Sequence, residues 1–323
     1  MMRSSDAVGD PFVFIVGRGR SGTTLVRAML TSHSDLAIPN ETHFIVPLSR
    51  DRRLFQSGDQ PNVEALLSKL RRQPGFRSMG LDNDEVAQLF DSERPGTYSD
   101  AIRLLFRMHA RNQGKNRFGD KTPIHVLHIE YLADLFPEAR FIHLIRDGRD
   151  VTLSIMDQHW GPESVWEGAV YWKRFVQAGR LAGARLGSDR YMELRYESLL
   201  DEPEEHVRAL CDFVALDFDP SMLRYFEKAD EITAGENHHR SIHLPPTKNL
   251  RNWRSEMSAA DVELFEVLAG DLLSELGYER ANTHVTFPAR TRAAVKWCSV
   301  QGSRVKRSLR KRTKRARKSF QPV

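Results

Sequence analysis

The stretch FVFIVGRGRSGTTLVRAML, residues 12–30, constrains the fold of this chain more than any other. Its first five residues are apolar and predict a buried parallel strand, and its second half predicts a helix from Thr23 to about Ser32. Gly17 and Gly22 lie between the two, at the spacing of a loop that wraps a phosphate group. The backbone N–H groups of such a loop, together with the N-terminus of the helix, form an anion site.

Two features set this loop apart from the loops of nucleoside triphosphatases. Thr23 stands where those loops carry the lysine that contacts the β- and γ-phosphates. The run RFIHLI predicts a second strand over residues 140–145, which is followed by Arg146 and not by an aspartate that holds magnesium. A P-loop kinase acting on a small metabolite would need both groups, and it stays the alternative among enzymes.

Arg146 predicts a second anion site beside the loop. The carboxyl ends of neighbouring parallel strands meet at one edge of a sheet, so this cation faces the same crevice as the loop. Ser154 lies in the expected helix over residues 149–158 and offers a hydroxyl to the same anion. Two anion sites on neighbouring strands indicate a ligand with two separated anionic groups.

The rest of the chain alternates strands with helices. The residue pattern predicts a helical insertion over residues 62–113 and a third strand over 190–195. This order predicts an α/β fold, in which a P-loop-like parallel sheet is flanked by helices and followed by a basic C-terminal tail. We expect one domain over residues 11–280 and a tail over 281–323. A long helix is expected over residues 164–186, and further amphipathic helices are expected over 204–214 and 259–276.

These motifs carry a family resemblance. GRGRSGTTLVRAML resembles the 5′-phosphosulfate-binding loop of sulfotransferases, and IRDGRDVTLS resembles their 3′-phosphate-binding segment, with Arg146 and Ser154 at the matching places. The resemblance covers roughly residues 11–280. It is closer to the tyrosylprotein, carbohydrate and bacterial branches, whose loop carries arginine, than to the cytosolic small-molecule branch, whose loop carries lysine.

The resemblance implies a donor and a set of donor-binding residues. The donor is 3′-phosphoadenosine 5′-phosphosulfate (PAPS), released as adenosine 3′,5′-bisphosphate, and no metal is expected. A loop that holds one sulfated phosphate needs no lysine–magnesium apparatus for a triphosphate. The residues assigned to the donor are Arg18, Gly19, Arg20, Ser21, Gly22, Thr23, Thr24, Arg146, Ser154, Tyr196, Lys248, Arg251 and Trp253.

Four residues are the candidates for catalysis. Glu41 matches a glutamate that these branches carry in an ETR-like setting, and it is the predicted general base for the acceptor hydroxyl. Arg20 and Lys121, the latter in the DKTP motif, are predicted to stabilise the charge on the leaving group. His43 is the rival base, because on an extended segment positions 41 and 43 point to the same face. We favour Glu41, with His43 as a helper on the acceptor side.

The assignments in the late loop rest on weaker patterns. Lys248, Arg251 and Trp253 are expected to close over the adenine and the 3′-phosphate as cations and a stacking surface. Packing of its own helix is an equal alternative for Trp253. His238, His239 and His243 lack a carboxylate partner in regular register, so they do not predict a metal site.

The end of the chain is strongly basic. From Arg280 onward there are Lys and Arg residues but no Asp or Glu, whereas the whole chain carries a net charge of only +5. Residues 289–318 are expected to be a solvated flexible tail or to bind an anionic membrane surface, with Trp297 at the interface. Binding to nucleic acid is the least favoured of the three alternatives.

Composition places the protein in a class and leaves its acceptor open. Two cysteines without disulfide or zinc spacing, and no signal-peptide pattern, predict a cytoplasmic protein that is peripheral to a membrane if the tail binds one. We expect an enzyme that sulfates the hydroxyl of a carbohydrate, a lipid-linked sugar or another acceptor. A nucleotide-binding or docking protein without catalysis is the alternative outside enzymes.

Overall fold

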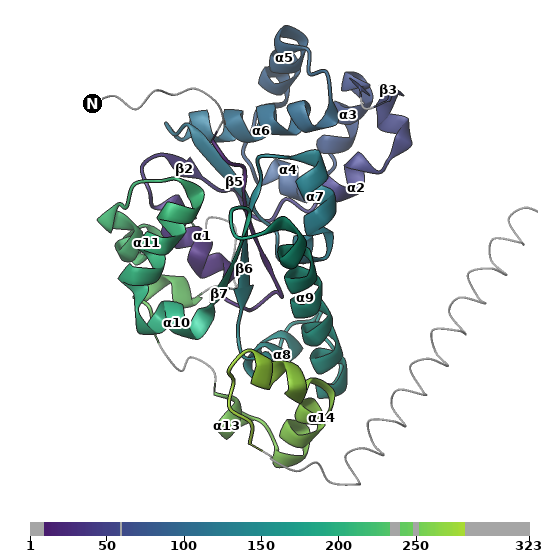
Figure 1. The fold of residues 1–323 in the computed structure, drawn as a ribbon. Helices are drawn as coiled ribbons and strands as arrows, with labels where there is room; N and C mark the ends of the chain where they lie inside the picture. Colours follow the sequence, from purple (N-terminus) through teal and green to yellow (C-terminus); the bar gives the residue numbers. More distant parts are fainter. Residues whose placement is uncertain (1–9, 59, 233–239, 248–251, 282–323) are drawn as a thin grey trace, which may run out of the picture. The chain divides into compact units, whose positions relative to one another are not determined.

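The computed structural model describes residues 10–58, 60–232, 240–247 and 252–281. The chain divides into two compact units, one of residues 1–146 and 174–250 and the other of residues 147–173 and 251–323. The central sheet lies in the first unit and has the strand order β2-β5-β1-β6-β7 (Figure 1). All its neighbouring strands are parallel. The strands are β1 Val13–Gly17, β2 Leu36–Ala37, β5 Arg117–Lys121, β6 Arg140–Ile145 and β7 Tyr191–Arg195.

The strand β1 lies between β5 and β6. Ile15 pairs with Lys121 on one side and with Ile142 on the other. The carboxyl ends of these three strands therefore meet at one edge, which is where α/β folds bind ligands. The α/β class and the prediction that the 140–145 strand lies beside the first are confirmed. The strand β5 was not predicted, because three of the five residues in its sequence RFGDK are charged. In the structure these three residues are nevertheless buried in the sheet.

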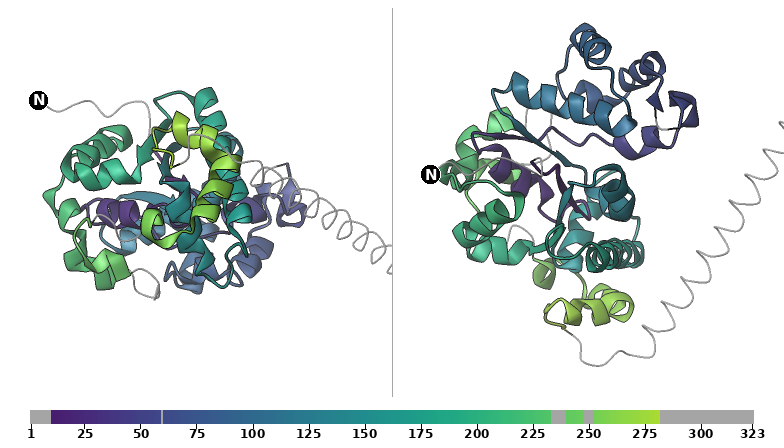
Figure 2. Two further views of the ribbon diagram at one scale, coloured as in Figure 1. Left: turned by 90° about the horizontal axis from the view of Figure 1, so that it is seen from below. Right: turned by 45° about the horizontal axis from the view of Figure 1, so that its top comes forward.

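Two hydrophobic clusters cover the two faces of the sheet in the first unit. Phe12, Phe14 and Val16 belong to one cluster, and Val13 and Ile15 belong to the other. This alternation follows from the two-residue period of a strand. Figure 2 shows the helices of this unit on both sides of the sheet. Both faces are buried, so the strand is apolar throughout, as expected for a central parallel strand.

Helices and short elements complete the first unit. The segment 63–112, where an insertion was predicted, is mainly helical, and α6 begins with a capping box between Thr97 and Asp100. The hairpin of β3 and β4 was not predicted. The elements are α1 Thr23–Thr31, α2 Ile45–Ser49, η1 Arg52–Leu54, β3 Phe55–Ser57, β4 Gln60–Pro61, α3 Val63–Leu70, α4 Pro74–Arg77, α5 Asn83–Glu93, α6 Tyr98–Asn112, η2 Pro123–His128, α7 Ile129–Leu135, α10 Tyr196–Asp201, α11 Pro203–Val214, η3 Pro220–Lys228, α12 Ala229–Ile232 and η4 Arg240–His243.

The second unit contains α8 Gly148–Met156, α13 Trp253–Glu256 and α14 Ala259–Glu275, and α9 Val165–Leu186 contributes its residues up to Lys173. The unit is packed around Trp172 and Phe265, whose ring centroids lie 5.7 Å apart. A Cβ atom at Gly148 would come within 2.4 Å of the Trp172 ring, so only glycine fits there. Within the described ranges, no helix is both long and apolar enough to cross a membrane.

Candidate active site

Two glycines shape the loop between β1 and α1. Gly17 has φ +154°, and a Cβ atom there would lie 2.6 Å from the carbonyl oxygen of Leu144 in β6. Gly22 has φ +97°, and a Cβ atom there would lie 2.3 Å from the ring of Tyr196. Arg20 between them also takes a left-handed conformation, at φ +74°. The loop is thus folded tightly against β6 and α10, where a larger residue at either glycine would push it away.

The helix α1 begins directly after this loop. Gly22 is its N-cap and supplies no side-chain hydrogen bond, and the first turn contains no acidic residue. The first N–H groups of a helix have no partner within the helix, and the helix dipole adds positive potential there. The side chains of Ser21 and Thr23 are almost fully buried at this point. This arrangement fits an anionic group such as a phosphate.

Lys121 connects three separate elements at the carboxyl edge of the sheet. Its ammonium group donates to Glu41 Oε1 at 2.9 Å and to Thr24 Oγ1, in the first turn of α1, at 3.4 Å. The Lys121 side chain is fully buried, whereas that of Glu41 is 34% exposed. A buried ammonium group beside an anion-binding loop is placed to bind an incoming anion. The structure therefore brings together Lys121, Glu41 and the loop, which are far apart in the sequence.

Glu41 also contacts His43. His43 Nε2 lies 2.9 Å from Glu41 Oε2, and the imidazole is more than half exposed. Burial by itself raises the pKa of Glu41, but the hydrogen bonds from His43 and Lys121 and their charges outweigh it and lower this pKa to about 2. The hydrogen bond to Glu41 raises the pKa of His43 above its usual value. The predicted extended segment is wrong at His43, where φ is +55°, yet the two side chains still meet.

A buried network behind the site holds this segment in place. Thr42, between the two site residues, donates its hydroxyl to Asp120 Oδ1 at 2.7 Å, and its N–H donates to Thr122 Oγ1 at 3.1 Å. Asp120 Oδ2 lies 3.0 Å from His125 Nδ1. Consecutive residues of a strand point to opposite faces, so Asp120 anchors the segment from one face while Lys121 lines the site on the other. Thr42, Asp120 and His125 were not predicted from the sequence to position the site.

Arg146 follows β6 and lies next to the loop. Its guanidinium group lies 4.7 Å from the centroid of the Tyr196 ring, and Nη1 is 3.5 Å from the carbonyl oxygen of Arg20. Tyr196 is the first residue of α10, directly after β7. Stacking on the Tyr196 ring holds the Arg146 guanidinium in a fixed orientation beside the loop. The structure thus places Arg146 and Tyr196 beside the loop, and the second anion site at Arg146 stays a prediction.

The other residues predicted to bind the donor are in the loop, in the second unit or outside the described residues. The Arg18 guanidinium lies 4.8 Å from the centroid of the Phe175 ring, and Gly19 is half-buried in the loop. Ser154 is buried in α8, which belongs to the second unit. Lys248 and Arg251 lie outside the described residues, as do His238, His239 and the basic segment 289–318.

Trp253 is packed within the second unit. Its backbone N–H donates to Asp150 Oδ1 at 2.8 Å, and the guanidinium of Arg149 lies 3.6 Å from its ring centroid. The Arg254 guanidinium also lies near the ring, at 4.5 Å. These contacts pack α13 against α8, and stacking of Trp253 on adenine stays a prediction. Among the described residues, no group of three or more His, Cys, Asp or Glu side chains is arranged to hold a metal ion.

Comparisons with known proteins agree with this geometry. The sequence model of the sulfotransferase family matches residues 11–220, and the chain belongs to this family. The chain is 26% identical to a protein-tyrosine sulfotransferase of Drosophila melanogaster, over 67% of this chain and 40% of that protein. It is 26% identical to protein-tyrosine sulfotransferase 1 of Danio rerio, over 83% of this chain and 72% of that protein. The match therefore spans less than half of the Drosophila protein.

A bacterial relative and two solved structures complete the comparison. The omega-hydroxy-beta-dihydromenaquinone-9 sulfotransferase of Mycobacterium bovis is 25% identical over 89% of this chain and 80% of that protein. The sulfotransferase domain of the Synechococcus PCC 7002 olefin synthase superposes with a TM-score of 0.61 at 24% identity, covering 86% of this chain and 98% of that one. The sulfotransferase domain from the curacin biosynthetic pathway gives a TM-score of 0.58 at 20% identity, over 84% and 99% of the two chains. The predicted family and fold are confirmed.

Proposed function

We propose that this protein transfers a sulfuryl group from PAPS to a hydroxyl group of an acceptor. Membership of the sulfotransferase family supports the reaction type. The observation that carries the assignment to this site is the contact of Lys121 with both Glu41 and Thr24, because it joins a cation, a base and the anion-binding loop at one point.

The residues present fit the donor. The backbone of residues 17–24 and the start of α1 suit the 5′-phosphate end, and Arg146 beside Tyr196 suits the 3′-phosphate. When bound, PAPS would supply a sulfuryl group on a phosphate leaving group. Ser154, Lys248, Arg251 and Trp253 stay proposals for the rest of the nucleotide, and no metal is required.

The reaction needs a base and cations. The acceptor oxygen forms a bond to sulfur while the bond from sulfur to the bridging phosphate oxygen breaks, giving a sulfate ester and adenosine 3′,5′-bisphosphate. Glu41 takes the proton of the acceptor hydroxyl. Lys121 and Arg20 stabilise the negative charge that builds on the leaving phosphate, with Thr23 and Thr24 helping to hold it.

The low pKa of Glu41 keeps its carboxylate ionised, as a base requires, but it also makes that carboxylate a weak base. At neutral pH the carboxylate is ionised and able to accept a proton, but a group with a pKa of about 2 is a weak base. Lys121 is one cause of that low value. If the Lys121 ammonium turns to an anionic ligand, its effect on Glu41 is removed and the carboxylate becomes more basic. His43 then remains as its hydrogen-bond partner and as the second candidate base.

Ligand binding tests the proposed function directly. Adenosine 3′,5′-bisphosphate should bind the purified protein with micromolar or tighter affinity in calorimetry, without magnesium, and raise its melting temperature. ATP with magnesium is the matched comparison, since a P-loop kinase would prefer it. Tight binding of ATP–magnesium together with no binding of the bisphosphate would refute the proposal.

We further propose, from the sequence alone, that the protein acts in the cytoplasm and that residues 289–318 bind an anionic membrane surface. Each Lys or Arg close to such a surface contributes about 1 kcal/mol. Sedimentation with anionic liposomes should pellet the full chain, and a chain ending at Ala281 should stay in solution. Equal pelleting of the two would remove the membrane proposal.

A further inference from the structure

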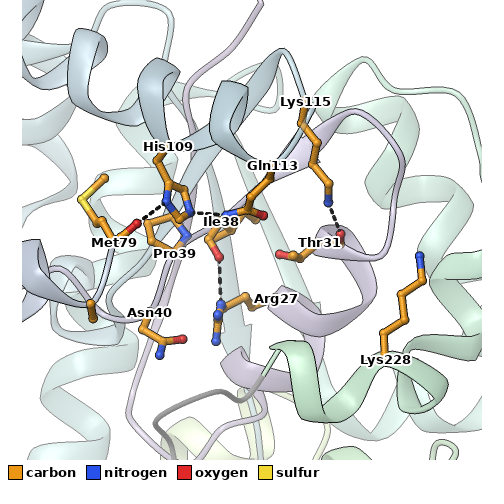
Figure 3. Close-up of a pocket in the computed structure, with 11 residues that line it drawn as sticks. Arg27, Thr31, Ile38, Pro39, Asn40, Met79, His109, Gln113, Lys115 and Lys228 are labelled. Carbon is orange, nitrogen blue, oxygen red and sulfur yellow. Dashed lines mark hydrogen bonds between the residues drawn. The ribbon is translucent and has the colours of Figure 1, made fainter. Parts of the chain in front are cut away.

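A cavity of about 500 Å³ lies on the side of α1 that faces α6, within the first unit (Figure 3). Its walls come from α1, the segment after β2, the end of α6 and the end of η3. The side chains that matter here are Arg27, Thr31, Asn40, His109, Lys115 and Lys228. None of the described residues assigned to the donor lines the cavity, so it is separate from the described part of the predicted PAPS site.

The cavity is lined by cations. Arg27, Lys115 and Lys228 all contribute to its wall, and no described residue that lines it is an Asp or Glu. Burial and, to a smaller extent, the charge of Lys228 lower the pKa of Lys115 to about 8, while Asp35, outside the cavity wall, acts in the opposite direction. Cations that repel one another in a partly buried space bind an anion favourably, because the anion removes the repulsion and supplies hydrogen-bond acceptors.

Two of the cations are held firmly in place. Arg27 is 5% exposed, and its Nε donates to the carbonyl oxygen of Ile38 at 2.9 Å. The Lys115 ammonium donates to the carbonyl oxygens of Thr31 at 2.5 Å and Leu36 at 3.1 Å. On the opposite wall, His109 is fixed by Met79 and Gln113. Arg27 and Lys115 are thus in place before a ligand binds, whereas Lys228 is the exposed one of the three cations and is able to move onto a ligand.

Two oxygen atoms in the cavity wall lack partners. Thr31 Oγ1 and Asn40 Oδ1 are buried, and neither has a hydrogen-bond partner among the residues that the structure describes. A buried polar atom without a partner costs free energy, so such atoms point to a ligand or water that supplies the bond. The Asn40 amide oxygen can only accept, so it requires a donor such as a ligand hydroxyl.

Two of the residues that line the cavity are close in the sequence to residues of the candidate active site. Thr24, which contacts Lys121, and Arg27 lie three residues apart and therefore on the same face of the helix, about 4.5 Å apart along its axis. The segment after β2 runs beside α1, because Arg27 Nε donates to the carbonyl oxygen of Ile38 in that segment. Asn40, in the same segment, immediately precedes Glu41. Arg27 thus lies about one helical turn from Thr24, and Asn40 is next to Glu41 in the sequence.

We propose that the cavity binds an anionic group of the acceptor, so that the substrate carries a carboxylate, sulfate or phosphate in addition to the hydroxyl that is sulfated. This rests on the proposed function. Arg27, Lys115 and Lys228 bind the anionic group, and Asn40 accepts a hydrogen bond from a further hydroxyl of the acceptor. The site therefore selects acidic hydroxyl compounds, such as sugar acids or phosphorylated sugars, over neutral alcohols.

Anion binding is tested by chemical labelling of Lys115, which does not depend on activity. The full chain, with adenosine 3′,5′-bisphosphate present in excess, is treated with limiting acetic anhydride in sodium sulfate or in sodium chloride of equal ionic strength. Mass spectrometry then compares acetylation of Lys115 with that of Lys173, which is paired with Asp271 outside the cavity. Sulfate should slow the acetylation of Lys115 at least fivefold and leave Lys173 unchanged.

Two matched variants assign this effect to the cavity. Lys228→Met removes an exposed cation from the wall and should raise the sulfate concentration for half protection about tenfold. Lys69→Met removes a lysine from α3, away from the cavity, and should leave it unchanged. Equal labelling of Lys115 in sulfate and in chloride, or equal protection in both variants, overturns the anion site.

Acceptor pairs in which one member has a carboxylate and the other a neutral group at the same position test the link to the reaction. Methyl glucuronide and methyl glucoside form one pair, and 4-hydroxyphenylacetate and 4-hydroxyphenylacetamide form the other. The acidic member should have the higher kcat/KM by about tenfold, and Lys228→Met should remove this preference by raising KM with kcat little changed. If neither member is sulfated, the acidic members should still protect Lys115 from acetylation.

The outcomes separate this inference from the proposed function. Failure to bind adenosine 3′,5′-bisphosphate would refute the sulfotransferase proposal, while protection of Lys115 by sulfate can still be measured. Normal binding of the bisphosphate with no protection of Lys115 would refute only the anion site. Protection by sulfate alone, without protection or preference for the acidic acceptors, shows that the cavity is not an acceptor site.

Discussion

Two charged clusters in this protein use the same kinds of groups in opposite ways. In the second unit, Arg149 donates to both carboxylate oxygens of Asp147, to Glu266 and to the carbonyl oxygen of Glu279, and it is 1% exposed. In the first unit, Lys121 is equally buried, but its partner Glu41 is one-third exposed. The first of these clusters is closed to solvent and the second is open on one side.

This difference indicates what each cluster does. A closed network satisfies its charges internally, and breaking it leaves carboxylates buried without a cation. In the open cluster, the buried Lys121 ammonium is paired with the partly exposed Glu41 carboxylate. An incoming anion can therefore replace Glu41 as the partner of the ammonium, because solvent still reaches the carboxylate. We therefore assign the Arg149 network to stability and the Lys121 cluster to chemistry.

The largest expected effect is on turnover. Glu41→Gln should lower kcat about 10²–10⁴-fold, because a general base contributes a factor of this size and the amide cannot accept the proton. The affinity for adenosine 3′,5′-bisphosphate in calorimetry should stay near that of the wild type. Glu64→Gln, at an exposed position in the first turn of α3, is the control. Turnover unchanged in Glu41→Gln would assign the base to another residue, with His43 first.

Loss of the closed network should act on stability. Arg149→Met should lower the free energy of unfolding by about 3–5 kcal/mol, because Asp147 and Glu266 are then buried without their cation. Urea denaturation of the full chain measures this loss. Arg53→Met, which breaks an exposed pair with Asp51, should leave the unfolding curve unchanged within error. Equal curves for the two variants would show that the network contributes no net stability.

Loss of the hydrogen bond from Thr42 to Asp120 should affect both stability and turnover. Thr42→Val keeps the shape of the side chain but removes the hydroxyl that donates to Asp120, and should cost about 1–3 kcal/mol of stability. It should also lower kcat, because Glu41 and His43 flank this residue. Denaturation and initial rates measure both effects, with Thr247→Val, whose hydroxyl contacts only the local Pro245 carbonyl among described residues, for comparison. A stability loss with full activity would show that the anchor does not position the site.

The smallest expected effect is a titration shift. The pKa of Glu41 is lowered to about 2, so its stabilising contribution is complete above about 4.5 and is lost as the pH falls toward 2. The pKa of His43 is raised, so its contribution is complete below 6.5 and is lost as the pH rises through the raised value. In Glu41→Gln the pKa of His43 should fall back toward 6.5 in an NMR titration, and in Glu64→Gln it should not. An unchanged His43 pKa would mean that the two side chains do not interact in solution.

The sequence predicted the parts of the site that local patterns encode. Local patterns predicted the loop after β1, the helix α1 and the strand that is followed by Arg146. Strand period, glycine spacing and helix period are all properties of short segments. The strand β5 was missed, since RFGDK shows neither alternation nor β-branched residues, and its place in the sheet depends on pairing with β1. The DKTP motif within and after it was found by resemblance alone.

By itself, the sequence determined the family, the α/β class and the types of residue that meet at the carboxyl edge of the sheet. Only the tertiary structure decided that Lys121 bridges Glu41 and Thr24, that Asp120 anchors Thr42 from the opposite face, and that Arg27, Lys115 and Lys228 share one cavity. The physical reason is range. Periodicity and turn chemistry act over a few residues, whereas these contacts join positions dozens of residues apart, which come together only when the parallel strands pair and the helices pack on them.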